Sequence, residues 1–206
     1  EAAKTYDFSY DFIDNASEDL SRLEGYLFPD TYEFYTNMSK PENALDKLLS
    51  NFNSKLDDDL LDKAEERGYD LKDIITIASL IEKETDGTDQ TKIASVIYNR
   101  LEGSGDKQGT YGLLQIDASL LYGLEDHEGT ITNADLQTDT PYNLYKYAGL
   151  PPTPIANPGL AAIQAALEPD NTDYYYYALG KDGVHHFFTN YADHLAFVNS
   201  SDYAGN

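Results

Sequence analysis

Apolar residues recur at helical spacing along the first half of the chain. Between Pro41 and Arg67 they fall three or four positions apart, which predicts a helix that begins at a proline and ends before Gly68. Two further segments, 71–85 and 89–101, each carry one apolar face and predict two more helices. The pattern therefore predicts that this half of the chain is mainly helical.

The second half of the chain consists of shorter apolar runs separated by turn-forming residues. Two of these runs, 174–179 and 185–188, flank Lys181-Asp182-Gly183, which is typical of a β-hairpin. The other runs predict a strand and a helical turn over 114–124, a helix over 160–167, and a helix over 191–198 with Asn190 as its N-cap.

A proline-rich tract over 140–159 interrupts these elements. Its five prolines exclude regular structure, while Leu150 and Ile155 give it apolar anchors that favour an ordered loop. We expect the part over 142–158 to form one wall of the main groove. The whole pattern predicts an α+β fold, in which a helical pair packs on a small antiparallel sheet beside this long Pro-rich ordered loop.

Charge and composition narrow the possible functions. The chain has 206 residues, and its 37 acidic and 14 basic residues give a net charge of −23 and a pI of about 4.2. Such a surface repels phosphate backbones and anionic lipid, so nucleic-acid binding and lipid docking are not expected. Cysteine is absent, which excludes disulfides and thiolate chemistry. The 18 tyrosines fit either a polar ligand, such as a sugar, stacked on aromatic rings or the compositional drift of an acid-rich organism.

The first of the two shorter helices ends with two candidate acids, Glu82 and Glu84. On a helical wheel Lys83 points away from the apolar stripe, and the two glutamates fall on either side of it as half-buried shoulders. Loss of solvation and the negative end of the helix dipole raise the pKa of a carboxyl group there, which suits a general acid. The wheel does not separate the two residues. The pattern is also consistent with ordinary flanking carboxylates paired with Arg100 or Lys92.

Other candidate chemistry has weaker signals. His185 and His186 are neighbours on a predicted strand and face opposite ways, and no metal-binding histidine spacing occurs. We therefore expect neither a metal site nor a cofactor. Gln115 and Asp117 share one face of a short extended segment, where they either line a groove or form the wet face of an edge strand.

Six short blocks follow one another along nearly the whole chain, from about Leu23 to His194. They are Glu24-Gly25-Tyr26-Leu27-Phe28-Pro29-Asp30-Thr31-Tyr32, Ala78-Ser79-Leu80-Ile81-Glu82-Lys83-Glu84-Thr85, Ala94-Ser95-Val96-Ile97-Tyr98-Asn99-Arg100-Leu101, Leu114-Gln115-Ile116-Asp117 with Tyr122-Gly123, Pro141-Tyr142-Asn143 with Gly149-Leu150-Pro151-Pro152 and Ile155-Ala156-Asn157-Pro158-Gly159, and His185 with Phe187, Thr189, Asn190 and His194. Together and in this order they resemble the YceG-like family, the endolytic murein transglycosylases of the MltG type. The chain departs from the family at Leu144, where threonine is usual, and we expect a LysM-like subdomain and a membrane helix to precede it.

The resemblance implies an N-terminal remnant over 1–22, a catalytic domain over 23–200 and a tail over 201–206. It implies a lytic transglycosylase that cleaves the β-1,4 bond between N-acetylmuramic acid and N-acetylglucosamine in peptidoglycan and leaves 1,6-anhydro-muramyl ends. One glutamate serves first as acid and then as base in this reaction, and the catalytic glutamate of the family aligns with Glu84.

The resemblance also suggests how the rest of the site is built. Peptidoglycan glycan strands are the expected substrate, cell-wall synthesis and division proteins are expected partners, and the expected location is the extracytoplasmic face of the bacterial membrane. The alternative is a non-catalytic glycan-binding module, which needs the tyrosines and the groove but no buried glutamate. A plain muramidase would cleave the same bond but leave a reducing end. The candidate substrate-binding residues are Glu82, Gln115, Asp117, Tyr142, Asn143, Thr189 and Asn190.

Overall fold

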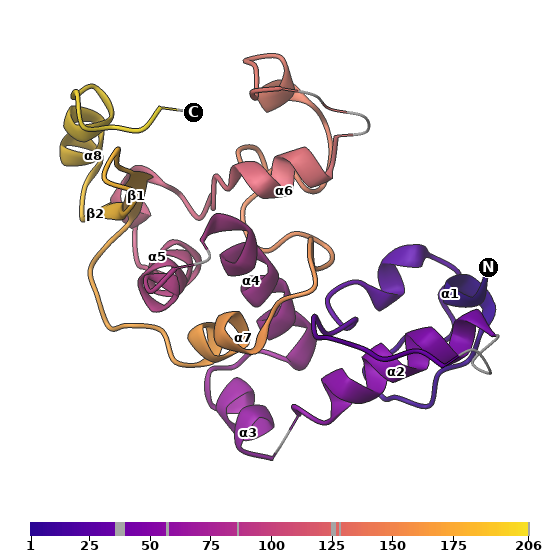
Figure 1. The fold of residues 1–206 in the computed structure, drawn as a ribbon. Coiled ribbons are helices and arrows are strands. Elements are labelled where there is room, and N and C mark those ends of the chain that lie inside the picture. The colour runs from indigo at the N-terminus through magenta and orange to yellow at the C-terminus, as the bar shows by residue number, and fades with distance from the viewer. Residues whose placement is uncertain (36–39, 57, 86, 125–126, 128, 206) are drawn as a thin grey trace. The chain divides into compact units, whose positions relative to one another are not determined.

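Helices form most of the elements, and the sheet is confined to the last part of the chain (Figure 1). The computed structural model describes residues 1–35, 40–56, 58–85, 87–124, 127 and 129–205. Within them lie eight α-helices and one antiparallel pair of strands, which confirms the predicted α+β class. The chain divides into two compact units, Glu1–Glu82 with Thr153–Leu167 and Lys83–Pro152 with Glu168–Asn206.

The first unit is built from helices. Every residue of its longest helix from Ile74 to Ile81 is buried, so this helix is a core element with apolar surroundings on all sides. Arg67 Nε donates a hydrogen bond to the carbonyl oxygen of Leu167 at 2.7 Å, where the third and seventh helices meet. The elements are α1 (Ala2–Thr5), the 3₁₀ turn Leu20–Leu23, α2 (Pro41–Asn53), α3 (Asp58–Glu66), α4 (Leu71–Glu84) without its last two residues, and α7 (Leu160–Leu167).

The prediction of one helix from Pro41 to Arg67 is wrong, because the structure has two helices there. Pro41 does open α2, as its fixed φ and missing N–H favour. After Asn53 the backbone tightens, and Ser54 Oγ donates to the carbonyl oxygen of Asn51 at 2.6 Å. Serine and asparagine satisfy the backbone with their own side chains in this way and so favour helix ends. The apolar spacing continues in α3, which is why periodicity alone joined the two helices.

The second unit holds the hairpin and the helices around it. Its strands pair in register from Tyr176 opposite Phe188 to Leu179 opposite His185, and α8 contacts both strands. Asn190 caps α8 as predicted, since its Oδ1 accepts the N–H of Asp193 at 3.0 Å. The elements are α5 (Gln90–Glu102), the 3₁₀ turns Lys107–Gly109 and Asp135–Gln137, α6 (Asp117–Tyr122), β1 (Tyr176–Leu179), β2 (His185–Phe188) and α8 (Tyr191–Val198).

The predicted packing is confirmed on one side of the helical pair. α5 contacts β1 within the second unit, as a helix packed on the sheet requires. α4 lies almost wholly in the first unit, so its packing on α5 stays a prediction. No helix in the described part of the chain is long and apolar enough to cross a membrane.

The chain after α8 pairs with the free edge of β1. The N–H of Lys181 donates to the carbonyl oxygen of Asp202 at 2.7 Å, and the N–H of Ala204 donates to that of Leu179 at 3.0 Å. These two bonds flank an antiparallel bridge between Gly180 and Tyr203. The last described residues therefore form an isolated bridge beside the end of β1 and do not add a strand to the sheet.

The strand predicted near residue 114 is wrong, whereas the helical turn that follows it is confirmed. Gln115 has a φ of 53°, in the left-handed region, which no strand accommodates. Asp117 is already the first residue of α6. The proline-rich tract, in contrast, has no helix or strand in the structure, as predicted from its prolines.

Candidate functional site

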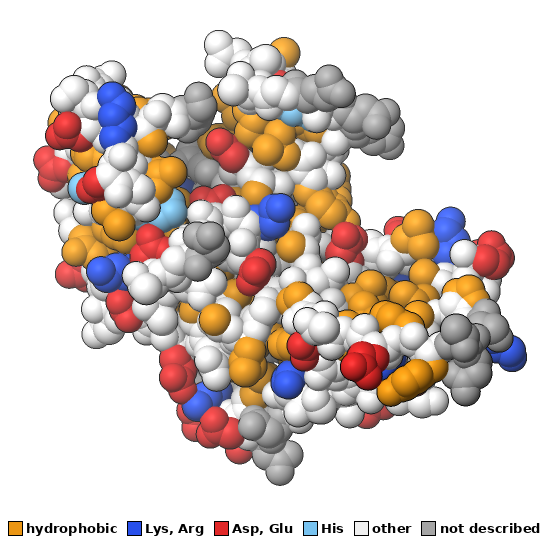
Figure 2. Space-filling model, in the orientation of Figure 1, with side chains coloured by type: hydrophobic (Ala, Val, Ile, Leu, Met, Phe, Trp, Pro, Cys, Tyr) orange, Lys and Arg blue, Asp and Glu red, His pale blue; other side chains and the backbone are white. Residues whose placement is uncertain are grey.

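A cavity of about 430 Å³ in the second unit brings together side chains from distant parts of the chain. Five of the side chains that line it are tyrosines, and others come from the end of α4, from α5, α6 and α8, and from the hairpin. Figure 2 shows the surface hollowed between the part that carries α8 and the part that carries α6, which Figure 1 labels. The cavity therefore combines aromatic walls with ionisable groups, as polar-ligand sites do.

Glu84 is the last residue of α4 and lines this cavity. Its side chain is half-buried, and the Tyr177 hydroxyl donates a hydrogen bond to its Oε2 at 2.6 Å. Burial raises the pKa of Glu84 above its ordinary value, and the nearby Asp117 carboxylate adds to the rise, while the Tyr177 hydrogen bond opposes it. A carboxyl group with a raised pKa at the edge of a cavity is suited to donate a proton.

Arg100 is a buried cation in the wall of the same cavity. Its Nε donates to the carbonyl oxygen of Tyr175 at 2.7 Å, its Nη1 donates to that of Leu114, and the guanidinium lies 5.2 Å from the centre of the Tyr176 ring. The charge of Arg100 lowers the pKa of Glu84, against the larger effect of burial. Within the described residues Arg100 forms no ion pair with Glu84 or Glu82, so the simple pairing that the sequence left open is not observed.

Gln115 and Asp117 both line the cavity with Glu84. The sequence predicted that these two residues lie on an extended segment. Instead, the left-handed backbone at Gln115 turns the chain into the start of α6. The Tyr145 hydroxyl donates a hydrogen bond to Asp117 Oδ1. Tyr145 also lines the cavity. Among the described residues of the proline-rich tract, it is the one that lines this cavity.

A second cavity of about 430 Å³ shares lining residues with the first and also borders Glu84. Three residues line both cavities, namely Glu84, Leu179 and His185. The second cavity also contacts the beginning of α5, where Asp89 and Lys92 lie. Glu84 therefore borders two cavities of similar size.

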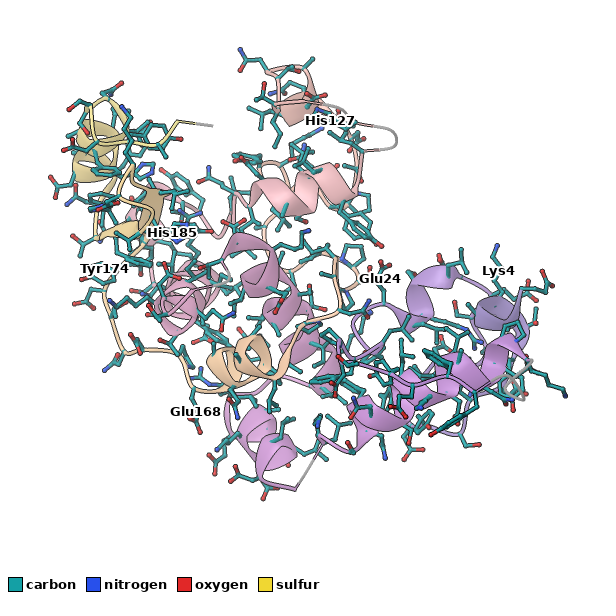
Figure 3. All side chains as sticks on the ribbon, in the orientation of Figure 1. Lys4, Glu24, His127, Glu168, Tyr174 and His185 are labelled. Atoms are coloured by element: carbon teal, nitrogen blue, oxygen red, sulfur yellow. The ribbon has the colours of Figure 1, made fainter. Side chains whose placement is uncertain are left out.

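His185 and Asp89 form a hydrogen-bonded pair beside Glu84. The distance from His185 Nδ1 to Asp89 Oδ2 is 2.7 Å, and the other carboxylate oxygen of Asp89 accepts the Thr85 hydroxyl at 2.7 Å. His186 pairs instead with Asp182, with 3.0 Å between Nε2 and Oδ2, as its place on the opposite face of β2 requires. Figure 3 labels His185 on the hairpin, close to the end of α4.

Four residues of this site were not among the sequence candidates: Arg100, Tyr145, Tyr177 and Asp89. Arg100 and Tyr145 lie in or next to the family-like blocks, so their neighbourhood carried a signal. Asp89 pairs with His185 across 96 positions, and Tyr177 pairs with Glu84 across 93 positions. Chemistry formed by such long-range pairs is visible only in the folded chain.

Glu82 has different surroundings from Glu84. The helical wheel predicted a half-buried side chain for Glu82, but the side chain is exposed. Its Oε2 accepts the N–H of Gly159 at 3.1 Å. Gly159 immediately precedes α7, so Glu82 satisfies one of the free N–H groups at the start of that helix. Glu82 does not line either cavity beside Glu84.

The remaining candidates also lie outside both cavities. Asn143 is fully buried, and its Nδ2 donates to the carbonyl oxygens of Leu136 and Thr138, so it braces the tract from within. Tyr142 packs on the Tyr122 ring, with 4.8 Å between the ring centres. Thr189 is exposed, and Asn190 is engaged in capping α8. Contact of these residues with a substrate stays a prediction.

Comparison with known proteins agrees with the motifs. The model of the YceG-like family matches residues 2–200. An endolytic murein transglycosylase from Bacillus subtilis is 39% identical over 162 residues, which are 78% of this chain and 43% of that protein. One from Streptococcus pneumoniae strain D39 is 31% identical over 175 residues, which are 84% of this chain and 31% of that protein.

A solved structure is similar over most of the chain. The crystal structure of a yceG-like protein from Listeria monocytogenes superposes with a TM-score of 0.74 at 35% identity, and the match covers 85% of this chain and 54% of that one. The chain thus spans less than half the length of the curated relatives. Because the family model covers nearly every residue and the motifs fall in its order, the chain belongs to the YceG-like family.

Proposed function

We propose that this chain carries the catalytic centre of an endolytic murein transglycosylase, with Glu84 as its acid. The observation that carries the proposal is the position of Glu84, a carboxyl group with a raised pKa that borders two adjoining cavities. An endolytic enzyme cuts within a strand and so needs room for sugars on both sides of the cleaved bond. Relatives that share 31–39% identity with the chain bear this name.

The proposed substrate is the glycan strand of peptidoglycan, and the bond is the β-1,4 link from N-acetylmuramic acid to N-acetylglucosamine. Glu84 donates its proton to the bridging oxygen as the bond to C1 breaks. The C6 hydroxyl of the same muramyl residue then closes on C1 and gives its proton to the Glu84 carboxylate, which yields a 1,6-anhydro end and consumes no water. The tyrosines of the first cavity would stack on sugar faces, since an aromatic ring offers an apolar surface and a polar edge.

We also propose where the enzyme works, which partners it has and which residues bind its substrate. An enzyme that acts on peptidoglycan works at the extracytoplasmic face of the membrane, where cell-wall synthesis and division proteins are its natural partners. The substrate-binding groups would include Gln115 and Asp117 within the first cavity. Residues 23–200 would form the catalytic part and 201–206 a tail whose Tyr203 also lines that cavity.

A hydrolase is the second candidate, and one observation favours it. Asp117 is a second carboxylate in the wall of the same cavity, and ordinary glycosidases use two carboxylates. Such an enzyme would add water and release a reducing muramyl end. Mass spectrometry of the products separates the two reactions, because the 1,6-anhydro end lacks the mass of one water molecule.

The proposal is tested with Glu84→Gln on purified murein sacculi. Glutamine keeps the shape and accepts the Tyr177 hydrogen bond but has no proton to give, so release of 1,6-anhydro-muropeptides should fall by roughly 10²–10⁴-fold or more. Glu82→Gln is the matched control, two positions away on the same helix, and should retain nearly full turnover.

Two outcomes would contradict the assignment. Loss of activity in Glu82→Gln with full activity in Glu84→Gln would move the acid to Glu82. Full activity in both would show that neither glutamate is the acid. Strand binding without cleavage by the unaltered chain would reject the catalytic interpretation and favour the glycan-binding module.

A further inference from the structure

We propose that His185, oriented by Asp89, is a second proton-transfer group of this site and accepts the proton of the hydroxyl that closes on C1. The proposal rests on the proposed function and changes one part of it: Glu84 remains the acid, and the base is a different residue. Three observations carry it, namely the unusual use of Asp89, the orientation of the imidazole, and the position of His185 next to Glu84.

Asp89 stands at the N-cap of α5 but does not cap it. An aspartate at this position ordinarily accepts an N–H from the first turn of its helix, and no such side-chain bond forms here. Its two oxygens instead accept the Thr85 hydroxyl and pair with His185 Nδ1, each at 2.7 Å. A favourable local interaction is therefore replaced by a long-range one, which is the pattern of a residue kept for a site.

The pair fixes the orientation of the imidazole. Burial alone would raise the pKa of Asp89, but the hydrogen bonds with Thr85 and His185 outweigh burial and hold it below its ordinary value. Asp89 is thus an ionised carboxylate that can only accept, so Nδ1 of His185 carries the hydrogen. In the neutral ring this leaves a lone pair on Nε2, and the described residues provide no hydrogen-bond partner for that atom.

His185 borders the same two cavities as Glu84. It is one of the three residues that line both cavities, and Glu84 is another. Tyr177 connects them, because its hydroxyl donates to Glu84 Oε2 and its ring meets the imidazole edge-on with 5.6 Å between the ring centres. The environments of the two acidic partners are opposite, since the pKa of Glu84 is raised and that of Asp89 is lowered. Glu84 is thus suited to donate a proton, while Asp89 is suited to orient the imidazole as a hydrogen-bond acceptor.

The proton balance of the step is complete without any further reactant. Glu84 gives its proton to the bridging oxygen as the C1–O bond breaks. The C6 oxygen forms its bond to C1 and gives its proton to Nε2 of His185. The site returns to its starting state when the proton on His185 passes to the Glu84 carboxylate, directly or through solvent.

The test measures turnover together with the ratio of two products. In His185→Gln we expect kcat to fall by roughly 10²-fold. We also expect more reducing ends relative to 1,6-anhydro ends, because water then competes with the unassisted C6 hydroxyl. Asp89→Asn should shift both quantities in the same direction, since an amide can donate as well as accept and no longer fixes the proton on Nδ1.

The chain contains a matched control. His186 is the next residue, lies on the same strand and pairs with Asp182 through a comparable bond, but it lines neither cavity. His186→Gln should leave kcat and the product ratio unchanged. Affinity for glycan strands, measured in a Glu84→Gln background, should be the same with and without His185→Gln, because the proposed role lies in proton transfer.

Several results would overturn the proposal. If His185→Gln and Asp89→Asn both turn over at the wild-type rate, Glu84 performs both proton transfers. If turnover falls but the product ratio does not change, the pair serves only to hold the hairpin against α5. If His185→Gln does not fold, Asp89→Asn decides by the same two readouts. Absence of 1,6-anhydro ends in the unaltered protein would instead reject the proposed function itself.

Discussion

Two groups of polar side chains in this chain have opposite uses. In the first unit, Ser79, Asn157 and Glu82 are all engaged with backbone N–H groups: Ser79 accepts that of Ile155 at 3.0 Å, Asn157 those of Gly25 and Leu27 at 3.0 Å each, and Glu82 that of Gly159 at 3.1 Å. These contacts hold residues 153–159 in place. We call this group the bracing group.

In the second unit, Glu84, Asp117 and His185 also form hydrogen bonds, but their partners are side chains and they border cavities. We call these three residues the cavity group. The comparison teaches that residue type does not separate a carboxylate that braces the backbone from one that borders a cavity. The difference lies in their surroundings. One kind of carboxylate accepts a hydrogen bond from a backbone N–H group, whereas the other has space beside it for a ligand.

The largest contrast between the groups is expected in how stability depends on pH. Burial raises the pKa of Glu84 in the folded state, so folding favours its protonated form. Its contribution to stability is therefore full at pH values below the unfolded pKa and is lost as pH rises through the folded value. Relative to wild type, Glu84→Gln should gain stability as pH rises above the unfolded pKa, and the gain should level off above the folded pKa, when urea unfolding is repeated from pH 4 to pH 8.

The control for this prediction is Asn157→Ala in the bracing group, which removes no titratable group and should differ from wild type by a constant amount across the same range. A constant difference in unfolding free energy between Glu84→Gln and wild type at every pH would show that the pKa of Glu84 is the same in the folded and unfolded states. The contrast between the two groups would then be lost.

The bracing group should show its effect in stability alone. Asn157→Ala leaves the N–H groups of Gly25 and Leu27 without their acceptor in a part-buried place, so unfolding free energy should fall by about 2 kcal/mol. Gly25 has a φ of 90°, and a Cβ there would lie 2.6 Å from Pro154 Cγ, so this backbone has little room to find another acceptor. Urea denaturation measures the loss, and Asn157→Asp, which keeps the acceptor, should recover most of it.

The smallest effect is expected at Glu82. Glu82→Ala removes an exposed acceptor from the N–H of Gly159 at the start of α7, and helix caps of this kind contribute about 0.5–1 kcal/mol. Thermal unfolding followed by circular dichroism is sensitive enough to detect such a change. A loss of turnover without a loss of stability in this variant would place Glu82 in the cavity group and contradict the comparison.

Much of the fold could be predicted from the sequence where the signal is local. The bounds of β2, α7 and α8 match the predicted ones, because turn residues, a capping asparagine and short apolar runs set them. The break between α2 and α3 could not be predicted from periodicity, since the apolar spacing continues through it. The backbone at Gln115 was missed because a left-handed φ is rare for a residue other than glycine.

The candidate site divides in the same way. Glu84, Gln115 and Asp117 lie in family-like blocks, and all three line the first cavity. The helical wheel treated Glu82 and Glu84 alike because it contains only the geometry of their own helix. Their partners, Gly159 and Tyr177, are 77 and 93 positions away. A local sequence pattern does not predict tertiary contacts of that range.

The pairing of residues 202–204 with β1 has a consequence for how this protein behaves in concentrated solution. A hairpin with a bare edge displays unpaired N–H and carbonyl groups that a second chain can use to build an intermolecular sheet. Here Lys181 N–H and Leu179 carbonyl oxygen already have partners within the same molecule. The segment therefore covers the end of the strand that borders the cavity and should oppose edge-to-edge aggregation there.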